Sequence, residues 1–476
     1  MFPGIKGYGV YIPRYRIKRE DIAKSWQGKS RGENSVANSD EDIITMSTEA
    51  AQNAVRHAGI DPASIGAIYL GSTSAPNIEQ SLLGTIAETL GTNAGTDMMC
   101  VGESTRAGTG AVKVCLDAIK AGTINNGLVI AADCRPASPG SDQELNFGVG
   151  AAAYILSSDN TVANIEEVFT YSTGFRDLWR EAGSSYVKEY EPKLTRGIGR
   201  HDHMVNATKG LLASIGIGID QFQHVVLYQP DARIPRVIAQ TLGIKPEQTE
   251  KASIFPQLGD TGSSSVLLGL ASVLDHAKPG DRILLVSYGS GISDAISLVV
   301  TNEIENKRNR GVSLIHYLDS KEYIDYLTYL KLNKALEKGG EPAKMALPPL
   351  SPVVVKEGPE LHRLIGAKCS KCGYVNFPPS ERKICIRCGN TSFEQVLLPR
   401  TGKIHTFCIS YYLPKGMESP LPIIIADLDD GTRHRALGTE MKPEEVKIDM
   451  PVELVLRELA SEGGLNLYAN VFRPPR

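Results

Sequence analysis

The sequence predicts an α/β fold built from a duplicated unit, followed by a small zinc ribbon and an all-β barrel. Short runs of β-branched residues alternate with helical patterns from about residue 7 to residue 300, which is typical of α/β proteins. A helix-and-strand segment of this region recurs farther along the chain. Two Cys-x2-Cys pairs then precede a series of short alternating segments. These observations give the order of the expected parts.

The recurring segment joins a helix rich in small residues to a buried strand. Its first copy has the helix at 109–118 and the strand at 127–132, and its second copy has them at 263–272 and 282–287. Any two α/β units share some of this pattern, but the same order of helix, turn and strand favours a duplication. We therefore expect two similar halves.

Beyond residue 300 the pattern changes and further parts begin. A charged connector leads to aromatic and aliphatic residues at helical spacing over 323–332, and a stretch rich in Pro, Gly and Lys follows. Four short alternating segments near the C-terminus indicate a small barrel of the OB type. The expected boundaries are 1–165 and 166–335 for the two halves, 336–360 for a linker, 361–395 for the zinc ribbon and 396–476 for the OB-fold.

Four of the eight cysteines form two Cys-x2-Cys pairs, and each pair is followed by a glycine. Four thiolates at this spacing suit tetrahedral coordination of one Zn²⁺. No histidine or carboxylate offers an obvious open coordination position, so we expect a structural metal and not a catalytic one. The expected ligands are Cys369, Cys372, Cys385 and Cys388.

The composition is that of an ordinary globular chain, with 42% hydrophobic and 22% charged residues and a mean hydropathy of -0.15. A net charge of -3 gives no support for nucleic-acid binding. No apolar run approaches the roughly 20 residues that span a bilayer, and the N-terminus lacks a secretory pattern. Scattered cysteines beside one metal-like cluster suit a reducing compartment, so we expect a cytoplasmic protein with no membrane partner.

Several motifs in the first 335 residues occur in a known order. They are Gly7 to Pro13, Ala132 with Asp133, Gln229 to Pro235, Lys278 to Arg282 and Ser287 to Gly291. On these motifs the region resembles the thiolase superfamily, in particular the archaeal-type 3-hydroxy-3-methylglutaryl-CoA synthases. The region from about residue 360 resembles the rubredoxin-like ribbon and OB domain that commonly accompany such proteins as a separate chain. The resemblance implies a five-layer αβαβα fold, a coenzyme A thioester as substrate, and a homodimer or higher homo-oligomer.

The resembling family uses a Glu, Cys and His trio, and all three positions are replaced in this chain. Thr73 stands at the Glu position in a Gly-Ser-Thr-Ser loop, and Thr105 stands at the Cys position before Arg-Ala-Gly-Thr. Tyr228 stands at the His position before Gln-Pro-Asp, and Asp260 replaces a further family Asn. Because the scaffold motifs remain, the replacements point to different chemistry.

An alcohol lacks the accessible thiolate of cysteine, so we do not expect an acyl-enzyme on Thr105. Acid–base catalysis on a bound acyl-CoA, with stabilisation of an enolate thioester, remains available. The sequence therefore predicts an aldol-type carbon–carbon lyase, or its reverse, that acts on an acyl-CoA and a small carbonyl compound. The architecture also resembles thiolase-fold aldolases of steroid side-chain breakdown.

Tyr228 is the first candidate for proton transfer. The supporting candidates are Thr73, Thr105, Glu103, Asp260 and His203.

Basic residues and a glycine-rich turn are candidate contacts for coenzyme A. Arg196, Arg200 and Lys209 would pair with its phosphates, although a solvated charged face is the default explanation. In the resembling family a turn brings backbone amides near the thioester. Its residues here are Gly289, Ser290 and Gly291.

Two other functions remain open. One is a 3-hydroxy-3-methylglutaryl-CoA synthase-like condensing acyltransferase with an unexpected nucleophile. The other is a non-catalytic scaffold that binds acyl-CoA or docks a partner enzyme through the ribbon and OB module. The intact glycine-rich segment around Thr105 favours an active enzyme.

Overall fold

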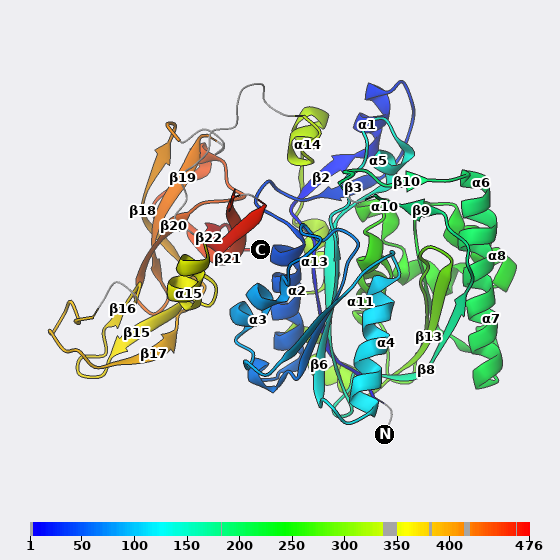
Figure 1. The fold of residues 1–476 in the computed structure, drawn as a ribbon, viewed down its shortest axis with the longest axis horizontal. Helices are drawn as coiled ribbons and strands as arrows, with labels where there is room; N and C mark the ends of the chain where they lie inside the picture. Colours follow the sequence, from blue (N-terminus) through cyan, green and yellow to red (C-terminus); the bar gives the residue numbers. More distant parts are fainter. Residues whose placement is uncertain (1–2, 182, 337–349, 380–382, 414–418, 463) are drawn as a thin grey trace. The chain divides into compact units, whose positions relative to one another are not determined.

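A computed structural model describes residues 3–181, 183–336, 350–379, 383–413, 419–462 and 464–476 (Figure 1). The chain forms two compact units, of which the first comprises residues 1–87 and 92–337 and the second residues 88–91 and 338–476. Among the helices in the described ranges, none combines the length and the apolar character needed to cross a membrane.

A nine-stranded sheet in the first unit contains the internal duplication. Its strands are β1 (Gly4–Tyr11), β4 (Ala67–Gly71), β5 (Asp97–Val101), β6 (Asn126–Asp133), β7 (Gly150–Ser157), β8 (Ala163–Ser172), β11 (His224–Leu227), β12 (Arg282–Val286) and β13 (Ile292–Val300). Their order is β11-β12-β13-β8-β1-β7-β6-β4-β5. The set β4-β6-β7-β1 has the same pairing as β11-β12-β13-β8, since in each set the first pair is parallel and the others antiparallel. The predicted duplication is therefore confirmed.

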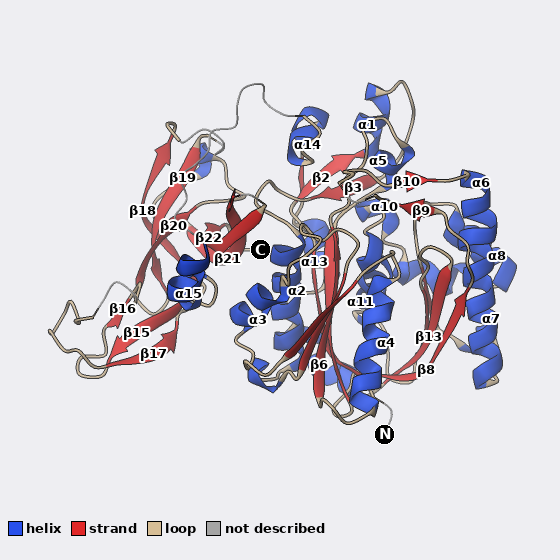
Figure 2. Ribbon diagram, in the orientation of Figure 1, coloured by secondary structure: helices blue, strands red, loops and turns tan. Residues whose placement is uncertain are grey.

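Helices cover the sheet and fill the space between its two halves (Figure 2). Helix α2 (Ile43–Ala58) packs on β1, β6 and β7, and α7 (His203–Ile215) packs on β8 and β13. Between the halves lie α4 (Ala107–Lys120) and α11 (Ser265–Leu274), and α11 contacts strands of both sets. Almost every residue of α11 is buried, which fits an apolar helix enclosed on all sides. These are the five αβαβα layers of the expected thiolase fold.

The two halves approach each other closely where α4 begins. A Cβ atom on Gly108 would lie only 2.3 Å from the carbonyl oxygen of Ser263, so a larger residue does not fit there. The hydroxyl of Ser263 donates a hydrogen bond to the carbonyl of Gly71 at 3.0 Å. The loops that carry the candidate site residues therefore meet at this junction.

The shorter elements also follow from local sequence, with two differences from prediction. The helix expected over 323–332 begins later, as α14 (Tyr326–Leu332), because β14 (Glu322–Tyr323) pairs with β2 (Tyr15–Lys18) and the Asp325 side chain caps the helix. The predicted linker contains helix α15 (Leu350–Leu361) in its last part, while residues 337–349 lie outside the described ranges.

The other strands of the first unit are β3 (Glu33–Val36), β9 (Leu178–Trp179) and β10 (Lys188–Glu189). The other α-helices within the described ranges are α1 (Arg19–Ser25), α3 (Leu83–Leu90), α5 (Asp142–Asn146), α6 (Pro192–Leu194), α8 (Ile234–Leu242), α9 (Pro246–Thr249), α10 (Phe255–Leu258), α12 (Glu303–Lys307) and α13 (Leu314–Asp319).

The second unit contains the ribbon and the barrel. The ribbon has a three-stranded sheet in the order β16 (Val375–Asn376), β15 (Ile365–Cys369), β17 (Phe393–Leu397). The barrel sheet runs β20 (Arg433–Leu437), β19 (Leu421–Leu428), β18 (Thr401–Ser410), β21 (Pro451–Glu462), β22 (Leu465–Arg473). A bridge between Gly438 and Phe472 joins its two edges, so the OB-like barrel is nearly closed. Along β19 every second residue is buried, as expected for a barrel wall.

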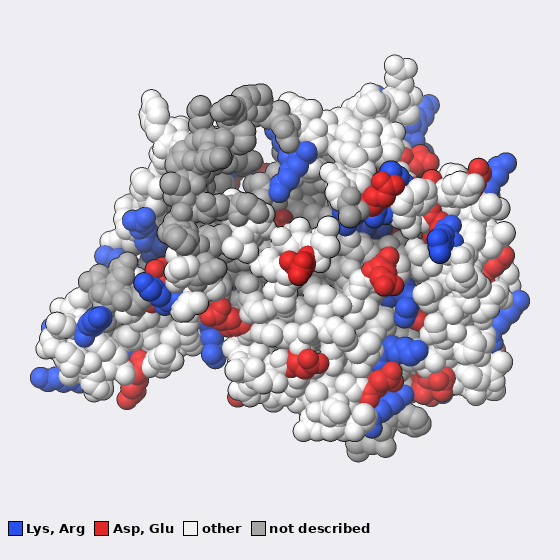
Figure 3. Space-filling model, viewed as in Figure 1, with Lys and Arg blue, Asp and Glu red and all other residues white. Residues whose placement is uncertain are grey.

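On the face drawn in Figure 3, acidic and basic side chains are interspersed. This agrees with the small net charge of -3.

Candidate active site and zinc ribbon

Thr105 lies in the turn between β5 and α4, and the second half of the first unit holds it there. Its side chain is buried, and its hydroxyl donates a 2.7 Å hydrogen bond to the carbonyl of Tyr288. The turn is also anchored by Arg106, whose guanidinium lies 2.9 Å from the Asp294 carboxylate, and by Thr109, which donates to Asp294 at 2.6 Å. The position of residue 105 is therefore set by its neighbours as well as by its own side chain.

Tyr228 lies directly behind Thr105, at the end of β11. The phenol is 2% exposed and donates a 2.9 Å hydrogen bond to Oδ2 of Asp260, and the Thr105 hydroxyl is within hydrogen-bonding reach of the same phenol. Burial, and then the charge of Asp260, raise the pKa of Tyr228 well above its usual value near 10. Tyr228 is therefore a neutral phenol that can pass a proton between a hydroxyl and a carboxylate.

Asp260 forms a buried ion pair with Arg135, a residue that the sequence did not single out. One terminal guanidinium nitrogen lies 2.8 Å from Oδ2 of Asp260, and both side chains are 3% exposed. The same nitrogen donates to the Asp260 carbonyl at 3.0 Å, and the guanidinium stacks on the Phe147 ring at 4.0 Å. Thr105, Tyr228 and Asp260 therefore form a series, and its last member belongs to this ion pair.

Thr73 is held by Asp133, the fully buried last residue of β6. The backbone N–H of Thr73 donates to Oδ1 of Asp133 at 2.7 Å, and its hydroxyl donates to the same oxygen at 3.0 Å. Ser72 and Ser74 add their hydroxyls at 3.1 and 2.9 Å, and Oδ2 accepts from the Ser263 N–H at 2.7 Å. A carboxylate with five donors serves as an anchor for the loop, and this anchor again links the two halves.

A cavity of about 220 Å³, here called the elbow cavity, opens at Thr105. Its lining is Thr73, Glu103, Ser104, Thr105, Arg135, Leu178, Trp179, Arg180, Val187 and Ser290. The sequence singled out four of these residues, and Trp179 and Arg180 from the β9 segment were missed. Tyr228 and Asp260 are not part of this lining. Tyr228 lies behind Thr105, and Asp260 is paired with Arg135, and both Thr105 and Arg135 line the cavity.

His203 lies outside this cavity and is neither a surface residue nor free to act on a ligand there. The ring is 2% exposed, and its Nδ1 faces the carbonyls of Ile198 and Gly199 at 2.7 and 2.8 Å. Its Nε2 is 2.8 Å from the hydroxyl of Thr173. Two carbonyls require a proton on Nδ1, and the Thr173 hydroxyl occupies Nε2, so both ring nitrogens are used by the fold.

The glycine-rich turn contributes its serine to the elbow cavity. Ser290 lines it, whereas the N–H of Gly289 donates to the carbonyl of Ile292 at 2.9 Å and the N–H of Gly291 donates to the Tyr288 hydroxyl at 3.3 Å. Both glycine amides thus donate within the turn in this structure, and contact of the turn with a thioester stays a prediction. The glycines matter for space, since a Cβ on Gly289 would lie 2.6 Å from Oγ of Ser104.

Two of the candidate phosphate contacts line a second cavity of about 80 Å³, here called the acidic cavity. Its charged residues are Asp142, Glu189, Arg196, Arg200, Asp231 and Asp260. Arg200 lies 3.6 Å from Glu189 and 4.0 Å from Asp231, so a phosphate would compete with two carboxylates for this guanidinium. Lys209 is exposed on α7 and is absent from the described lining of both cavities. Phosphate binding by these three residues stays a prediction.

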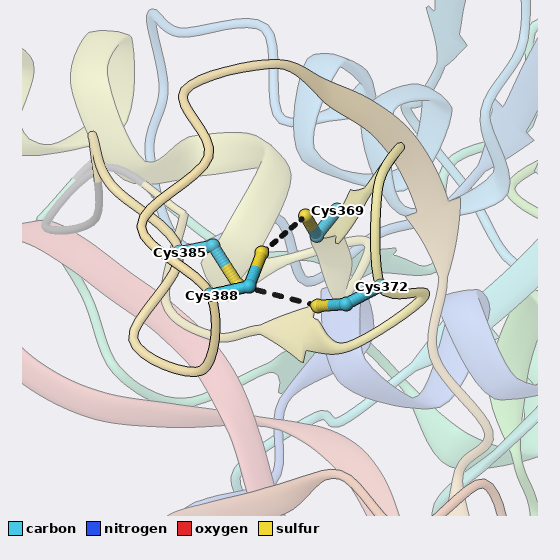
Figure 4. A group of neighbouring side chains, drawn as sticks. All are labelled: Cys369, Cys372, Cys385 and Cys388. Carbon is cyan, nitrogen blue, oxygen red and sulfur yellow. Dashed lines mark hydrogen bonds between the residues drawn. The ribbon is translucent and has the colours of Figure 1, made fainter.

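The four ribbon cysteines converge as predicted (Figure 4). All four Sγ atoms lie within 4.8 Å of one another, and the pairs Cys369–Cys388 and Cys372–Cys385 are 3.6 Å apart. A tetrahedral site with Zn–S distances near 2.3 Å requires sulfur atoms roughly 3.8 Å apart, so the residues fit Zn²⁺. Both knuckles turn at a glycine with positive φ, Gly373 and Gly389, whose N–H donates to the carbonyl of the first cysteine of its pair at 2.9 Å.

Comparison with known proteins identifies the family. A hydroxymethylglutaryl-CoA synthase of Methanopyrus kandleri is 38% identical over 343 residues, which cover 70% of this chain and 98% of the relative. The chain belongs to the hydroxymethylglutaryl-CoA synthase family. A synthase of the same description from Methanocaldococcus jannaschii is 36% identical over 343 residues, covering 70% of this chain and 99% of that protein. The 3-oxoacyl-[acyl-carrier-protein] synthase III C-terminal family matches residues 212–300.

The second unit matches two further families. The ChsH2 rubredoxin-like zinc ribbon domain matches residues 356–394, and the ChsH2 C-terminal OB-fold domain matches residues 395–457. These matches confirm the ribbon and the OB-fold.

Solved structures support the fold of the first unit. MvaS in complex with 3-hydroxy-3-methylglutaryl coenzyme A superposes with a TM-score of 0.65 at 18% identity, covering 73% of this chain and 94% of that one. The curacin-pathway HMG synthase in complex with acetyl donor-ACP gives 0.63 at 21% identity, with 70% and 88% covered. These structures confirm the predicted thiolase fold. The 38% identical relative confirms the family predicted from the motifs, and by family the chain is an acyl-CoA condensing enzyme.

Proposed function

We propose that this member of the synthase family makes or cleaves a carbon–carbon bond by aldol chemistry on a β-hydroxyacyl-CoA, without an acyl-cysteine intermediate. The observation that carries the proposal is the series Thr105, Tyr228 and Asp260, in which the phenol donates to the buried carboxylate of Asp260 at 2.9 Å. The Thr105 hydroxyl donates to the Tyr288 carbonyl in this structure and would turn to the phenol, which lies within its reach, to complete the path. Such a series moves protons and does not supply a nucleophilic thiolate.

The cysteines of the first unit support this view. Cys115 is buried and Cys134 is half-buried, and desolvation raises the pKa of each thiol to about 12, so neither supplies a thiolate near neutral pH. Cys100 is exposed on β5. Among the described residues, no cysteine lines the elbow cavity or the acidic cavity. An acyl-enzyme of the usual kind therefore has no attachment point beside the site.

In the cleavage direction, the proton of the β-hydroxyl passes to Thr105, the Thr105 proton passes to Tyr228, and the Tyr228 proton passes to Asp260. The oxygen electrons then form the carbonyl, the carbon–carbon bond breaks, and its electrons form the thioester enolate. Arg135 lines the cavity and is paired with Asp260 at rest; once Asp260 has taken up the proton, the guanidinium charge is free to stabilise the enolate oxygen. Glu103, which is exposed and lines the same cavity, starts this direction as the carboxylic acid and gives its proton to the α-carbon. Asp260 then releases the hydroxyl proton, and Glu103 takes up a proton from solvent, so that no net proton is gained or lost. Condensation is the same sequence reversed.

A coenzyme A thioester is the proposed substrate because the relatives are synthases of a CoA ester and MvaS was solved with one bound. The elbow cavity of about 220 Å³ suits a short acyl group together with a small carbonyl compound.

We also propose a homodimer. Strand β5 ends the nine-stranded sheet, and it is exposed although it carries Met98 and Met99, which are 39% and 40% exposed. An exposed apolar edge strand is a ready template for pairing with a second copy. Size-exclusion chromatography with light scattering tests this, and replacement of Met98 and Met99 by lysine should give monomers.

The central test combines a reactant panel with matched variants. Purified protein is incubated with acyl-CoA esters plus aldehydes or ketones, and with the corresponding β-hydroxyacyl-CoA esters, and products are measured by mass spectrometry. Thr105→Val and Tyr228→Phe should each lower turnover roughly 100-fold or more because each interrupts the proton path, whereas Thr105→Ser keeps the hydroxyl and should stay active. Unchanged turnover in Tyr228→Phe would exclude the proposed path.

A second candidate is a condensing acyltransferase in which Thr105 itself carries the acyl group, and the 38% identity to synthases favours it. Intact mass measurement after incubation with labelled acetyl-CoA separates the two. An acyl adduct that disappears in Thr105→Val supports the transferase and contradicts the aldolase. No turnover and no adduct with any thioester would leave the scaffold function.

A further inference from the structure

Arg180 is a cation of the elbow cavity that the proposed mechanism does not use. It follows β9 and lines the cavity together with Thr105 and Arg135. A terminal nitrogen of its guanidinium donates a 2.6 Å hydrogen bond to the carbonyl of Thr73. The ion pairs found within the described ranges do not include Arg180.

Arg180 is exposed, but the carbonyl that it contacts belongs to an anchored loop. The carbonyl that accepts its hydrogen bond belongs to Thr73, whose N–H and hydroxyl are both held by the buried carboxylate of Asp133. One guanidinium nitrogen is therefore fixed to an anchored loop, while a guanidinium has five N–H donors in a planar fork. The remaining donors suit a planar anion with two oxygens, such as a carboxylate.

The other charges of the elbow cavity make Arg180 its main uncompensated cation. Arg135 is neutralised by Asp260 at 2.8 Å. Glu103 is the acidic side chain of the lining; it is exposed and forms no ion pair with Arg180 among the described residues. A bound anion would therefore be attracted to the Arg180 wall of the cavity, next to the hydroxyl of Thr105.

We propose that Arg180 binds the carboxylate of the carbonyl reactant, so that this reactant is a short 2-oxo acid rather than a neutral aldehyde or ketone. The inference rests on the proposed function, since it names the carbonyl compound of that reaction. In condensation the α-carbon of the thioester loses a proton, bonds to the keto carbon, and the keto oxygen takes a proton. The product is a β-hydroxyacyl-CoA with a carboxylate on the β-carbon, and no oxidant or further reactant is required.

The test compares an anionic partner with its neutral methyl ester, which is larger by one methyl group. Acetyl-CoA and propionyl-CoA are each offered with pyruvate or with methyl pyruvate, and kcat/KM is measured for the wild type, Arg180→Gln, Arg180→Lys and Arg176→Gln. Arg176 is an exposed arginine on the same segment and is absent from the described lining, so Arg176→Gln is the matched control. We expect the wild type to prefer pyruvate. Arg180→Gln should lower kcat/KM for pyruvate at least about tenfold and leave methyl pyruvate within about twofold, with partial recovery in Arg180→Lys.

Other outcomes would overturn the inference in distinguishable ways. Equal use of pyruvate and methyl pyruvate by the wild type, or an equal loss of both in Arg180→Gln, would contradict carboxylate recognition but leave the aldol function standing. Arg180 would instead bind a phosphate of coenzyme A if Arg180→Gln raised KM for acetyl-CoA but not for acetyl-pantetheine. No turnover with any partner in the wild type would contradict the proposed function itself.

Discussion

The most exact stability prediction concerns the Arg135–Asp260 ion pair. Both side chains are 3% exposed and their closest atoms are 2.8 Å apart. Removing one partner of such a buried pair leaves an uncompensated charge, which costs about 3–5 kcal/mol of unfolding free energy. Arg135→Met should therefore destabilise the first unit by about this amount. Arg135→Met combined with Asp260→Asn should recover roughly 2 kcal/mol of it, because no buried charge then remains.

Tryptophan fluorescence during urea unfolding measures this effect in the right part of the chain. Both tryptophans of the protein, Trp26 and Trp179, belong to the first unit, so the ribbon and barrel do not contribute to the signal. Arg282 provides the matched control, since it also lies 2.8 Å from a carboxylate, that of Glu166, but the two side chains are 27% and 28% exposed. Arg282→Met should cost less than about 1 kcal/mol. A similar small cost for Arg135→Met, or a double variant as unstable as the sum of both single changes, would refute the reasoning.

Three further predictions concern stability and metal content. His57 is 1% exposed, and burial, with Lys307 and Arg310, lowers its pKa to about 4, so the unfolded chain binds a proton that the folded one does not. The first unit should therefore lose up to about 3 kcal/mol as the pH falls from roughly 6.5 to 4, and a His57→Gln variant followed by the same fluorescence assay should show a shallower pH dependence. Asp133→Asn should cost about 2–3 kcal/mol and distort the Thr73 loop, since an amide NH₂ would face groups that all donate; an unchanged urea midpoint would contradict this. Metal analysis should find one zinc per chain, lost in Cys372→Ser and on chelation, with tryptophan fluorescence unaffected; zinc retained in Cys372→Ser would argue against the four-thiolate site.

Much of the architecture could be predicted because it follows from patterns among residues close together in the sequence. The ribbon follows from the spacing of four cysteines, and the duplicated halves follow from a helix and a strand that recur in the same order. The start of α14 was missed because strand pairing by Glu322 and Tyr323 is a contact between distant segments, which helical spacing does not reveal.

The candidate site was only partly predictable for the same reason. Thr105 and Thr73 were found through short motifs, and both line the elbow cavity. Arg135 and Arg180 were missed because their partners, Asp260 and Thr73, lie more than a hundred residues away in the chain. The pair Ala132 and Asp133 was a visible motif, yet only the folded structure reveals that its carboxylate anchors the Thr73 loop.

The turn that carries Thr105 keeps its shape mainly through groups other than residue 105. Arg106 and Thr109 bind Asp294, and Gly289 leaves the space in which Ser104 and Arg106 pack. Evolution can therefore exchange the side chain at this position without dismantling the surrounding architecture. An enzyme with a cysteine at this position can in this way acquire a new reaction by a few substitutions. In protein design, residue 105 can likewise be replaced while the turn keeps its shape.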